Sequence, residues 1–203
     1  MNIVCLDLEG VLVPEIWIEF AELTGIEALR ATTRDIADYD ELMTMRLETL
    51  RERGLGLPDI QQVIAKLEPL PGAAEFLQTL RSHYQVVILS DTFYEFAQPL
   101  MRQLDWPTLF CHSLQCEPNG RISGYTLRMK AHKQAAVEAF KQLNFRVVAA
   151  GDSYNDTGML GAADRGLLFN APERVMMDFP NFAVSHDYRT LAEQIAEGFA
   201  ADG

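Results

Sequence analysis

The chain begins MNIVCLDLEG (residues 1–10), and this stretch decides most of the interpretation of the fold. An apolar run, IVCL at residues 3–6, ends abruptly in Asp7, Glu9 and Gly10. In open α/β sheets, ligands bind in the crevice outside the carboxyl ends of the strands, so a buried strand ending in two carboxylates indicates a site. Asp7 and Glu9 lie two apart and point to the same side of an extended chain. The alternative is an acidic turn that caps the next helix.

The composition is that of an acidic chain with a substantial core. The 203 residues are 48% hydrophobic, and the formal net charge is −12. This length accommodates one domain of roughly 150 residues plus an insertion, or one larger domain. The charge disfavours nucleic acid and anionic membranes as partners, because binding them requires clustered Lys and Arg. A small phosphorylated substrate stays compatible with it, since one local group of donors can outweigh the global field.

Three cysteines, Cys5, Cys111 and Cys116, show no metal-ligand spacing. An odd number of cysteines without a signal peptide predicts free thiols and a cytoplasmic location. The chain shows neither a basic region followed by an apolar one at its start nor an apolar stretch of membrane-spanning length, so no membrane association is predicted.

Strand and helix patterns alternate along most of the chain. Residues 15–68 are predicted to be helical throughout. Further helices are predicted at 72–82, 94–104, 132–142, 155–163 and 187–199. Strands are predicted at 85–89, 109–116, 121–128, 146–150 and 166–169, with a hairpin turn at Asn119-Gly120. The alternation predicts an α/β fold, a doubly wound, Rossmann-like parallel sheet with a small β-hairpin. We expect a core domain of residues 1–14 and 69–203 and an inserted helical cap domain, 15–68, that closes the site and excludes water.

Three separate predicted strands end in polar groups. These are Asp7 and Glu9, then Ser90 and Asp91, then Asp152 in the segment GDSYND, residues 151–156. Because the carboxyl ends of parallel strands share one edge of the sheet, the three tips are expected to converge, and Lys133 begins a helix of the same core. Each feature has an alternative when taken alone: Ser90-Asp91-Thr92 as a helix cap, GDSYND as a capped loop, and Lys133 as a solvated helix residue. Their joint occurrence favours a site.

Convergent carboxylates suit Mg²⁺, which binds few protein carboxylates and keeps waters and substrate oxygens. Ser90 and Lys133 together suit a phosphoryl group, as one hydrogen-bond donor and one point charge. An Asp carboxylate beside a metal can attack phosphorus and form an aspartyl-phosphate. The set therefore predicts phosphoryl transfer, which depends mainly on positioning and charge neutralisation.

These motifs resemble those of the haloacid dehalogenase superfamily, over nearly the whole chain. The superfamily carries Asp-x-Asp after the first strand, Ser or Thr after the second, a Lys, and an acidic motif after a later strand. The helical insertion and the segments LPGAAEFLQTLR and GDSYNDTGML are similar to those of the phosphoserine phosphatase family. The chain departs from the usual residues of that family at three places: Glu9, Val11 and Asp91-Thr92. These departures resemble the ThrH-type branch of the family, which is described as also transferring phosphate to homoserine.

The resemblance implies a phosphoserine phosphatase that uses Mg²⁺, with homoserine as a second acceptor. Asp7 would be the nucleophile and Glu9 the general acid/base. The metal would be held by Asp7, Asp152 and the backbone carbonyl of Glu9, with Asp156 in support. The implied phosphate-binding residues are Ser90, Asp91 and Lys133, and the implied substrate-binding residues are Glu15, Arg46 and Asn155. Arg46 would pair with the substrate carboxylate and Glu15 with its ammonium group.

Three alternatives stay open. The first is a phosphatase for another small phosphomonoester. The second is a receiver domain, a signalling switch that also gathers acids, a hydroxyl and a lysine at strand ends, although a first-strand nucleophile and a helical insertion do not fit it. The third is a binding module with an inactive site, for which Glu9 is the weak point. No ligand role is assigned to the scattered histidines, and a homodimer is expected from apolar residues predicted to be exposed: Trp106, Phe179 and Phe182.

Overall fold

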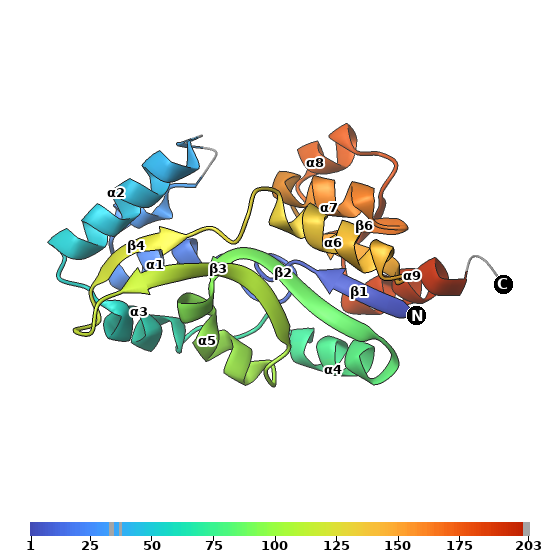
Figure 1. Ribbon diagram of the computed structural model, residues 1–203, viewed down its shortest axis with the longest axis horizontal. Coiled ribbons are helices and arrows are strands. Elements are labelled where there is room, and N and C mark those ends of the chain that lie inside the picture. Colours follow the sequence, from blue (N-terminus) through green and yellow to red (C-terminus); the bar gives the residue numbers. More distant parts are fainter. Residues whose placement is uncertain (33–34, 37, 201–203) are drawn as a thin grey trace.

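The computed structural model, which describes residues 1–32, 35–36 and 38–200, is built on one seven-stranded sheet (Figure 1). The strand order is β4-β3-β2-β1-β5-β6-β7. The strands are β1 (Asn2–Leu6), β2 (Gln85–Phe93), β3 (Thr108–Cys116), β4 (Ile122–Thr126), β5 (Arg146–Gly151), β6 (Arg165–Phe169) and β7 (Ala183–Ser185). All neighbours run parallel except β3 and β4, which form the antiparallel hairpin. The predicted fold class is confirmed.

Helices connect the strands at nearly the predicted positions. They are α1 (Ile16–Thr24), α2 (Tyr39–Glu52), α3 (Leu57–Ile64), α4 (Ala73–His83), α5 (Tyr94–Gln103), α6 (His132–Gln142), α7 (Thr157–Ala162), α8 (Glu173–Asp178) and α9 (Tyr188–Ala200), with 3-10 turns η1 (Glu27–Arg30) and η2 (Tyr154–Asp156). Helix α8 and strand β7 were not predicted, because six and three residues are too few to show a period. The segment 15–68 is not helical throughout: turns separate its helices, and residues 33, 34 and 37 lie outside the described residues.

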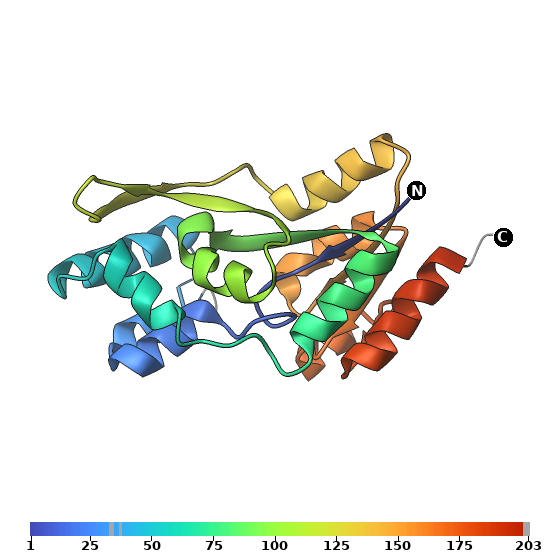
Figure 2. The ribbon, with the colours of Figure 1, turned by 90° about the horizontal axis from the view of Figure 1, so that it is seen from below.

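Alternate side chains of β1 enter two separate cores, which is why the strand reads as a continuous apolar run. Val4 and Leu6 join the larger cluster, which includes residues of α4, α5 and α9. Ile3 and Cys5 join the smaller cluster, which includes residues of α6, α7 and α8. Figure 2 shows α6 on one side of the sheet and α4 and α9 on the other. Residues 3–6 of β1 are therefore buried, and the polar side chains of Asp7 and Glu9 follow at its carboxyl end.

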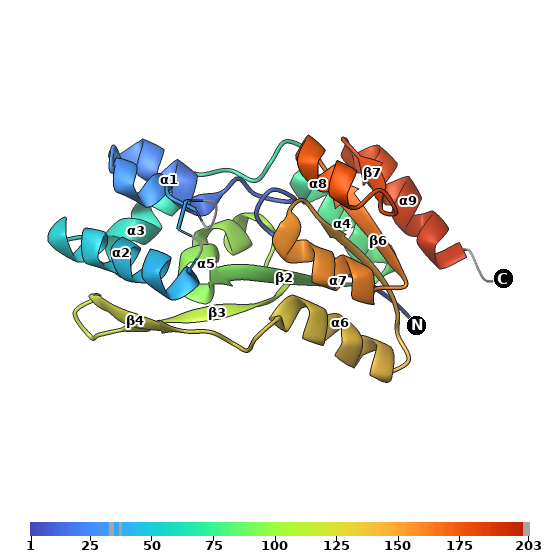
Figure 3. The same ribbon diagram turned by 90° about the horizontal axis from the view of Figure 1, so that it is seen from above.

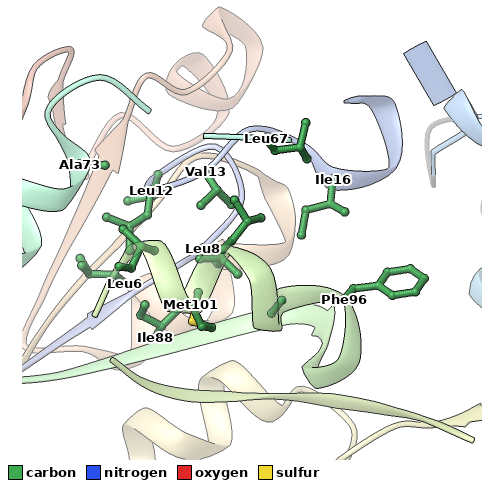
Figure 4. Close-up of a cluster of buried hydrophobic side chains, with 14 of the residues drawn as sticks. Leu6, Leu8, Leu12, Val13, Ile16, Leu67, Ala73, Ile88, Phe96 and Met101 are labelled. Carbon is green, nitrogen blue, oxygen red and sulfur yellow. The ribbon is translucent and has the colours of Figure 1, made fainter. Parts of the chain in front are cut away.

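The chain after β1 turns tightly and returns to the core. Leu8 and Leu12 are buried near Leu6, and Ile16 is buried farther along the same cluster (Figure 4). The Leu8 carbonyl accepts hydrogen bonds from the N–H groups of Leu12 and Val13, at 2.8 and 3.0 Å. Because these apolar residues anchor the turn on both sides, the acidic residues between them are directed to the sheet edge.

Helices α1, α2 and α3 lie together at one end of the molecule, next to the β3–β4 hairpin (Figure 3). The hairpin turn forms at Asn119-Gly120, as predicted, and the Gly120 carbonyl accepts a hydrogen bond from the N–H of Leu57 at the start of α3, at 2.8 Å. The Tyr125 hydroxyl on β4 donates to the Asp40 carboxylate on α2. The helices are thus supported by the hairpin.

Two of the aromatic residues expected at the surface are not exposed. Phe179 and Phe182 are half-buried, stack on each other at 5.9 Å between ring centroids, and pack against the smaller core cluster. Trp106 is exposed over 57% of its surface. Among the described residues, no helix is both long and apolar enough to cross a membrane.

Candidate functional site

The three polar strand tips meet at one edge of the sheet. In the register, Leu6 at the end of β1 lies opposite Ile88 of β2 on one side and Ala150 of β5 on the other. The N–H of Asp7 continues this pairing with a 2.9 Å hydrogen bond to the Ala150 carbonyl. Strand β1 thus lies between the next strand in sequence and β5, the switch point at which open α/β sheets bind ligands.

Lys133 is the cationic centre of this edge. Its side chain is only 5% exposed, and its Nζ lies 2.9 Å from Asp7 Oδ1, 2.9 Å from Asp156 Oδ1 and 3.3 Å from Asp91 Oδ2. Burial alone would lower the pKa of Lys133, but these three carboxylates hold the pKa well above its usual range. The alternative of a solvated helix lysine is therefore wrong.

Three carboxylates crowd together beside Lys133. One oxygen from each of Asp7, Asp152 and Asp156 lies within 4.8 Å of the others. Burial, followed by the charge of Asp156, raises the pKa of Asp7 well above its ordinary value and that of Asp152 to about 7. Asp152 makes no ion pair in the described part of the chain. Clustered hard oxygens with unbalanced negative charge are the donor set that Mg²⁺ prefers.

Glu9 caps the next helix, as predicted by the alternative in which the first motif is an acidic turn. Its Oε2 accepts a 3.0 Å hydrogen bond from the N–H of Ile16, the first residue of α1. Burial, and then the negative charge of Glu15, raises the pKa of Glu9 to about 8. Capping and site placement therefore coexist, because the same carboxylate lies close enough to Lys133 to feel its charge.

Ser90 and Thr92 do not cap a helix. Strand β2 continues through both to Phe93, which is itself the residue preceding α5. The pairing of β2 with β3 is irregular between Leu89 and Phe93, so the strand changes register where its polar residues begin. Ser90 is buried, and its Oγ accepts a 3.2 Å hydrogen bond from the N–H of Thr92, which keeps the hydroxyl at the sheet edge.

The GDSYND segment is both a capped loop and part of the site. Ser153 and Asp156 form a capping box at the start of η2. Asp156 is fully buried: its Oδ2 accepts from the N–H groups of Asp152 and Ser153 at 3.0 and 3.2 Å, while its Oδ1 contacts Lys133. The loop therefore presents Asp152 to the site with Asp156 behind it.

Asp91 gathers donors from several elements, and two of them were missed from the sequence. Its carboxylate accepts from His132 Nε2 at 2.9 Å and from Asn155 Nδ2 at 2.8 Å, and lies 3.6 Å from His112 Nε2. Burial would raise the pKa of Asp91, but Lys133 and these hydrogen bonds hold it well below its usual range. The one signal in the sequence was that His132 directly precedes Lys133; nothing indicated that His112, in another strand, would join it.

Arg46 lies on α2, near enough to Glu9 and Glu15 for their charges to interact with its guanidinium. Its guanidinium carbon lies 4.5 Å from the centroid of the Trp17 ring, and its Nη2 donates to the Ala31 carbonyl at 2.7 Å. Burial lowers the pKa of Arg46 to about 10, while the negative charges of Glu9 and Glu15 act in the opposite direction. Its Nε is buried without a hydrogen-bond partner in the described chain. Trp17 was not identified from the sequence, because an aromatic residue in an amphipathic helix is usually core.

Residues 1–164 match the family of haloacid dehalogenase-like hydrolases. Over 194 residues the chain is 62% identical to phosphoserine phosphatase ThrH of Pseudomonas aeruginosa. The alignment covers 96% of this chain and 95% of that protein. The chain is 61% identical to a phosphoserine phosphatase of Pseudomonas syringae pv. tomato, covering 96% of this chain and 82% of that protein.

Solved structures share the fold at lower identity. A phosphoserine phosphatase in its apo form superposes with a TM-score of 0.76 at 19% identity, covering 95% of this chain and 98% of the other. A phospho-aspartyl intermediate analogue of phosphoserine phosphatase gives the same TM-score, identity and coverage. At this level of identity the likeness establishes the architecture.

Proposed function

The chain belongs to the haloacid dehalogenase-like hydrolases, and within them to the phosphoserine phosphatases, and we propose that it hydrolyses phosphoserine through an aspartyl-phosphate on Asp7. The observation that carries this proposal is the contact of Asp7 Oδ1 with the buried ammonium of Lys133 at 2.9 Å, beside two further carboxylates. A carboxylate held at a sheet edge next to a fixed cation is placed to attack an electron-poor phosphorus.

Two displacements at phosphorus complete the reaction. In the first, a carboxylate oxygen of Asp7 forms a bond to phosphorus, the bond to the serine oxygen breaks, and Glu9 gives a proton to that oxygen. In the second, Glu9 takes a proton from water as the water oxygen bonds to phosphorus, and the bond to Asp7 breaks to release inorganic phosphate. The hydrogen bond from the N–H of Ile16 to Glu9 Oε2 fixes the position of this carboxylate.

The residues present fit Mg²⁺. Asp7 and Asp152 would hold it, with the backbone carbonyl of Glu9, and Asp156 would support Asp152. When bound, the ion neutralises charge on the phosphoryl oxygens. Gly10 supports this fit, since a Cβ at that position would lie 2.5 Å from the Asp152 carboxylate carbon. The backbone has been brought against Asp152 at a position where only glycine leaves room.

Ser90, Lys133 and Asn155 would bind the phosphate, the first by its hydroxyl and the second by its charge. Asp91 contributes through Lys133, because an ionised carboxylate repels a phosphate directly. Helices of the segment 15–68, our proposed cap domain, would supply Arg46 for the substrate carboxylate and Glu15 for its ammonium. The unpaired Nε of Arg46 supports this role, because a buried donor without a partner calls for an acceptor.

Transfer of the phosphoryl group to homoserine is the second part of the proposal. Its hydroxyl would replace water in the second displacement, with Glu9 accepting its proton. The support is the 62% identity with ThrH. Product analysis of phosphoserine reactions with and without homoserine tests it: phosphohomoserine is expected only with homoserine, and inorganic phosphate alone in both would limit the function to hydrolysis.

Acid-quench trapping tests the nucleophile. Wild type mixed with phosphoserine labelled in its phosphate is expected to retain label on Asp7, and Asp7→Asn to retain none. Label on Asp7→Asn would overturn the assignment. Loss of turnover on adding EDTA tests the metal, and a complete lack of turnover with Mg²⁺ would favour an inactive binding module instead.

Arg46→Ala separates phosphoserine from another phosphomonoester as substrate. If Arg46 binds the amino-acid carboxylate, turnover of phosphoserine collapses while that of an aryl phosphate is spared. Equal loss of turnover on both substrates would contradict amino-acid recognition.

A cytoplasmic location also belongs to the proposal, supported by the three free thiols. We also propose a homodimer, which the exposed apolar side chain of Trp106 supports.

A further inference from the structure

The carboxylate of Asp91 joins four structural elements. It lies in β2 and receives His132 and Lys133 from α6, Asn155 from η2 and His112 from β3. Its two oxygens have different partners. Oδ1 faces the two histidines, and Oδ2 lies 3.3 Å from Lys133 Nζ and 2.8 Å from Asn155 Nδ2. Both histidines are at least 95% buried, whereas the Asp91 side chain is 39% exposed, so the network leads from the site into the interior.

A backbone hydrogen bond to His112 orients its ring so that Nε2 faces Asp91. The backbone N–H of Arg128 donates to His112 Nδ1 at 3.1 Å, so the neutral ring carries its proton on Nε2. That Nε2 is the nitrogen that faces Asp91. Asp91, His112 and His132 offer ligand atoms within 4.8 Å of one another, but a metal would need the Nε2 lone pair that this tautomer does not have. The ionised carboxylate can only accept, so His132 Nε2 donates to it at 2.9 Å, and the Nε2–H of His112 faces it at 3.6 Å.

His132 and Lys133 are the first two residues of α6, and both reach Asp91. His132 Nε2 contacts Oδ1 and Lys133 Nζ contacts Oδ2, so one carboxylate ties the start of the helix to the end of β2. The preceding residue, Ala131, has a φ of 47°, a left-handed conformation that is uncommon for alanine and that the surrounding contacts must maintain. The position of the Lys133 ammonium depends on this attachment.

We propose that Asp91, hydrogen-bonded by His132 and flanked by His112, forms a clamp that positions Lys133 for the phosphoryl group. The clamp rests on the proposed function, in which Lys133 meets the phosphate bound at Asp7. Asp7 and Asp156 hold the ammonium from one side, at 2.9 Å each, and Asp91 holds it from another. When a phosphoryl group competes for the ammonium, Asp91 and its histidines keep the lysine aligned. These are positioning residues, since they act through Lys133.

Two substitutions at His132 isolate the hydrogen bond to Asp91. His132→Phe keeps an aromatic ring and removes the donor, whereas the amide nitrogen of His132→Gln can take the place of Nε2. Binding of inorganic phosphate with Mg²⁺ is measured by calorimetry, and kcat and KM are measured with phosphoserine. We expect His132→Phe to raise the Kd for phosphate about tenfold and to lower kcat about tenfold, each equivalent to about 1.4 kcal/mol. His132→Gln is expected to stay within about threefold of wild type.

A control variant measures the effect of stability alone. Gln194→Leu removes a 3.1 Å hydrogen bond from Gln194 to the Val184 carbonyl, between α9 and β7, and is expected to lower Tm without changing the Kd or kcat. Unchanged Kd in His132→Phe, or a loss that His132→Gln does not restore, would overturn the clamp, as would a wild type that does not bind phosphate. A wild type that binds phosphate but does not hydrolyse phosphoserine would instead overturn the proposed function.

Discussion

The carboxylate of Glu9 and the backbone N–H of Ile16 are joined by a hydrogen bond of 3.0 Å. This bond connects the proposed acid/base directly to the first turn of α1, the helix that also carries Trp17 beneath Arg46. The proposed acid/base is therefore attached to the helix whose Trp17 supports Arg46, the residue proposed to bind the substrate carboxylate. A shorter side chain at position 9 would reach less far toward that helix.

Glu9→Gln is expected to lower kcat by about 10²–10⁴-fold, because the amide can still accept from Ile16 but cannot transfer a proton. Glu9→Asp keeps the acid and loses the bond to Ile16, so it is expected to lower the free energy of unfolding by about 1 kcal/mol with a smaller loss of kcat. Steady-state kinetics and urea unfolding check the pair. A Glu9→Gln variant as active as wild type would contradict the acid/base role.

Gly10→Ala is expected to weaken Mg²⁺ activation. Gly10 has a φ of 77°, and its new Cβ would lie 2.5 Å from the Asp152 carboxylate, so Asp152 must shift. We expect the Mg²⁺ concentration for half-maximal activity to rise at least about tenfold, and left-handed alanine to cost about 1–2 kcal/mol of stability. Gly161→Ala, inside α7 with open space around it, is the matched control and should leave Mg²⁺ activation unchanged. Equal Mg²⁺ requirements in both variants would argue against Asp152 as a ligand.

Tyr188→Phe is expected to lower the free energy of unfolding by about 1 kcal/mol. The Tyr188 hydroxyl donates to the Val11 carbonyl at 2.7 Å, from a ring stacked between Phe76 and Phe169. Removing it leaves a carbonyl of the turn after β1 without this donor. Tyr84→Phe is the control, because the Tyr84 hydroxyl makes no hydrogen bond within the described ranges. Urea denaturation compares the two, and an equal loss of stability in both would show that the bond to Val11 contributes nothing.

A thiol reagent at pH 8 is expected to modify one cysteine rapidly in the native protein and three in urea. Cys5 and Cys111 are buried, and burial raises the pKa of Cys5 to about 12, so its thiol stays protonated and unreactive at this pH. Raising the pH to 9 should not expose it to reaction, because the pKa is still about three units higher. Cys116 is exposed. Counting released thiolate by absorbance checks this, and two fast thiols in the native state would contradict the buried assignment.

Short-range patterns predicted the parts of this fold that chain neighbours determine. The run ending in Asp7 predicted a strand tip, and the shared edge of parallel strands then predicted that Ser90 and Asp152 would meet it. The capping alternative held for Glu9 and failed for Ser90, because whether β2 ends before or after residue 90 depends on its pairing with β3. Local propensity has no access to that pairing.

Long-range contacts account for most of what was missed. His112 and His132 come together at Asp91 only once β3 and α6 are packed, and their spacing in the chain carries no period. Trp17 reads as an ordinary core residue until α2 places Arg46 over it. Helix α8 and strand β7 are stabilised by the core around Val175 and by β6, so their short sequences predicted nothing alone.

The hydrogen bond between Leu57 and Gly120 bears on how such proteins can be recombined. The helices at 16–64 adjoin a hairpin that is encoded later in the chain, from Thr108 onward, and β4 is an edge strand of the sheet. A chimaera that exchanged those helices between relatives without the hairpin would disrupt the contact between them. It would then expose the edge of β4, and exposed strand edges promote aggregation. The helices at 16–64 and the β3–β4 hairpin are therefore expected to be exchanged only together, although they are encoded by two separate segments of the sequence.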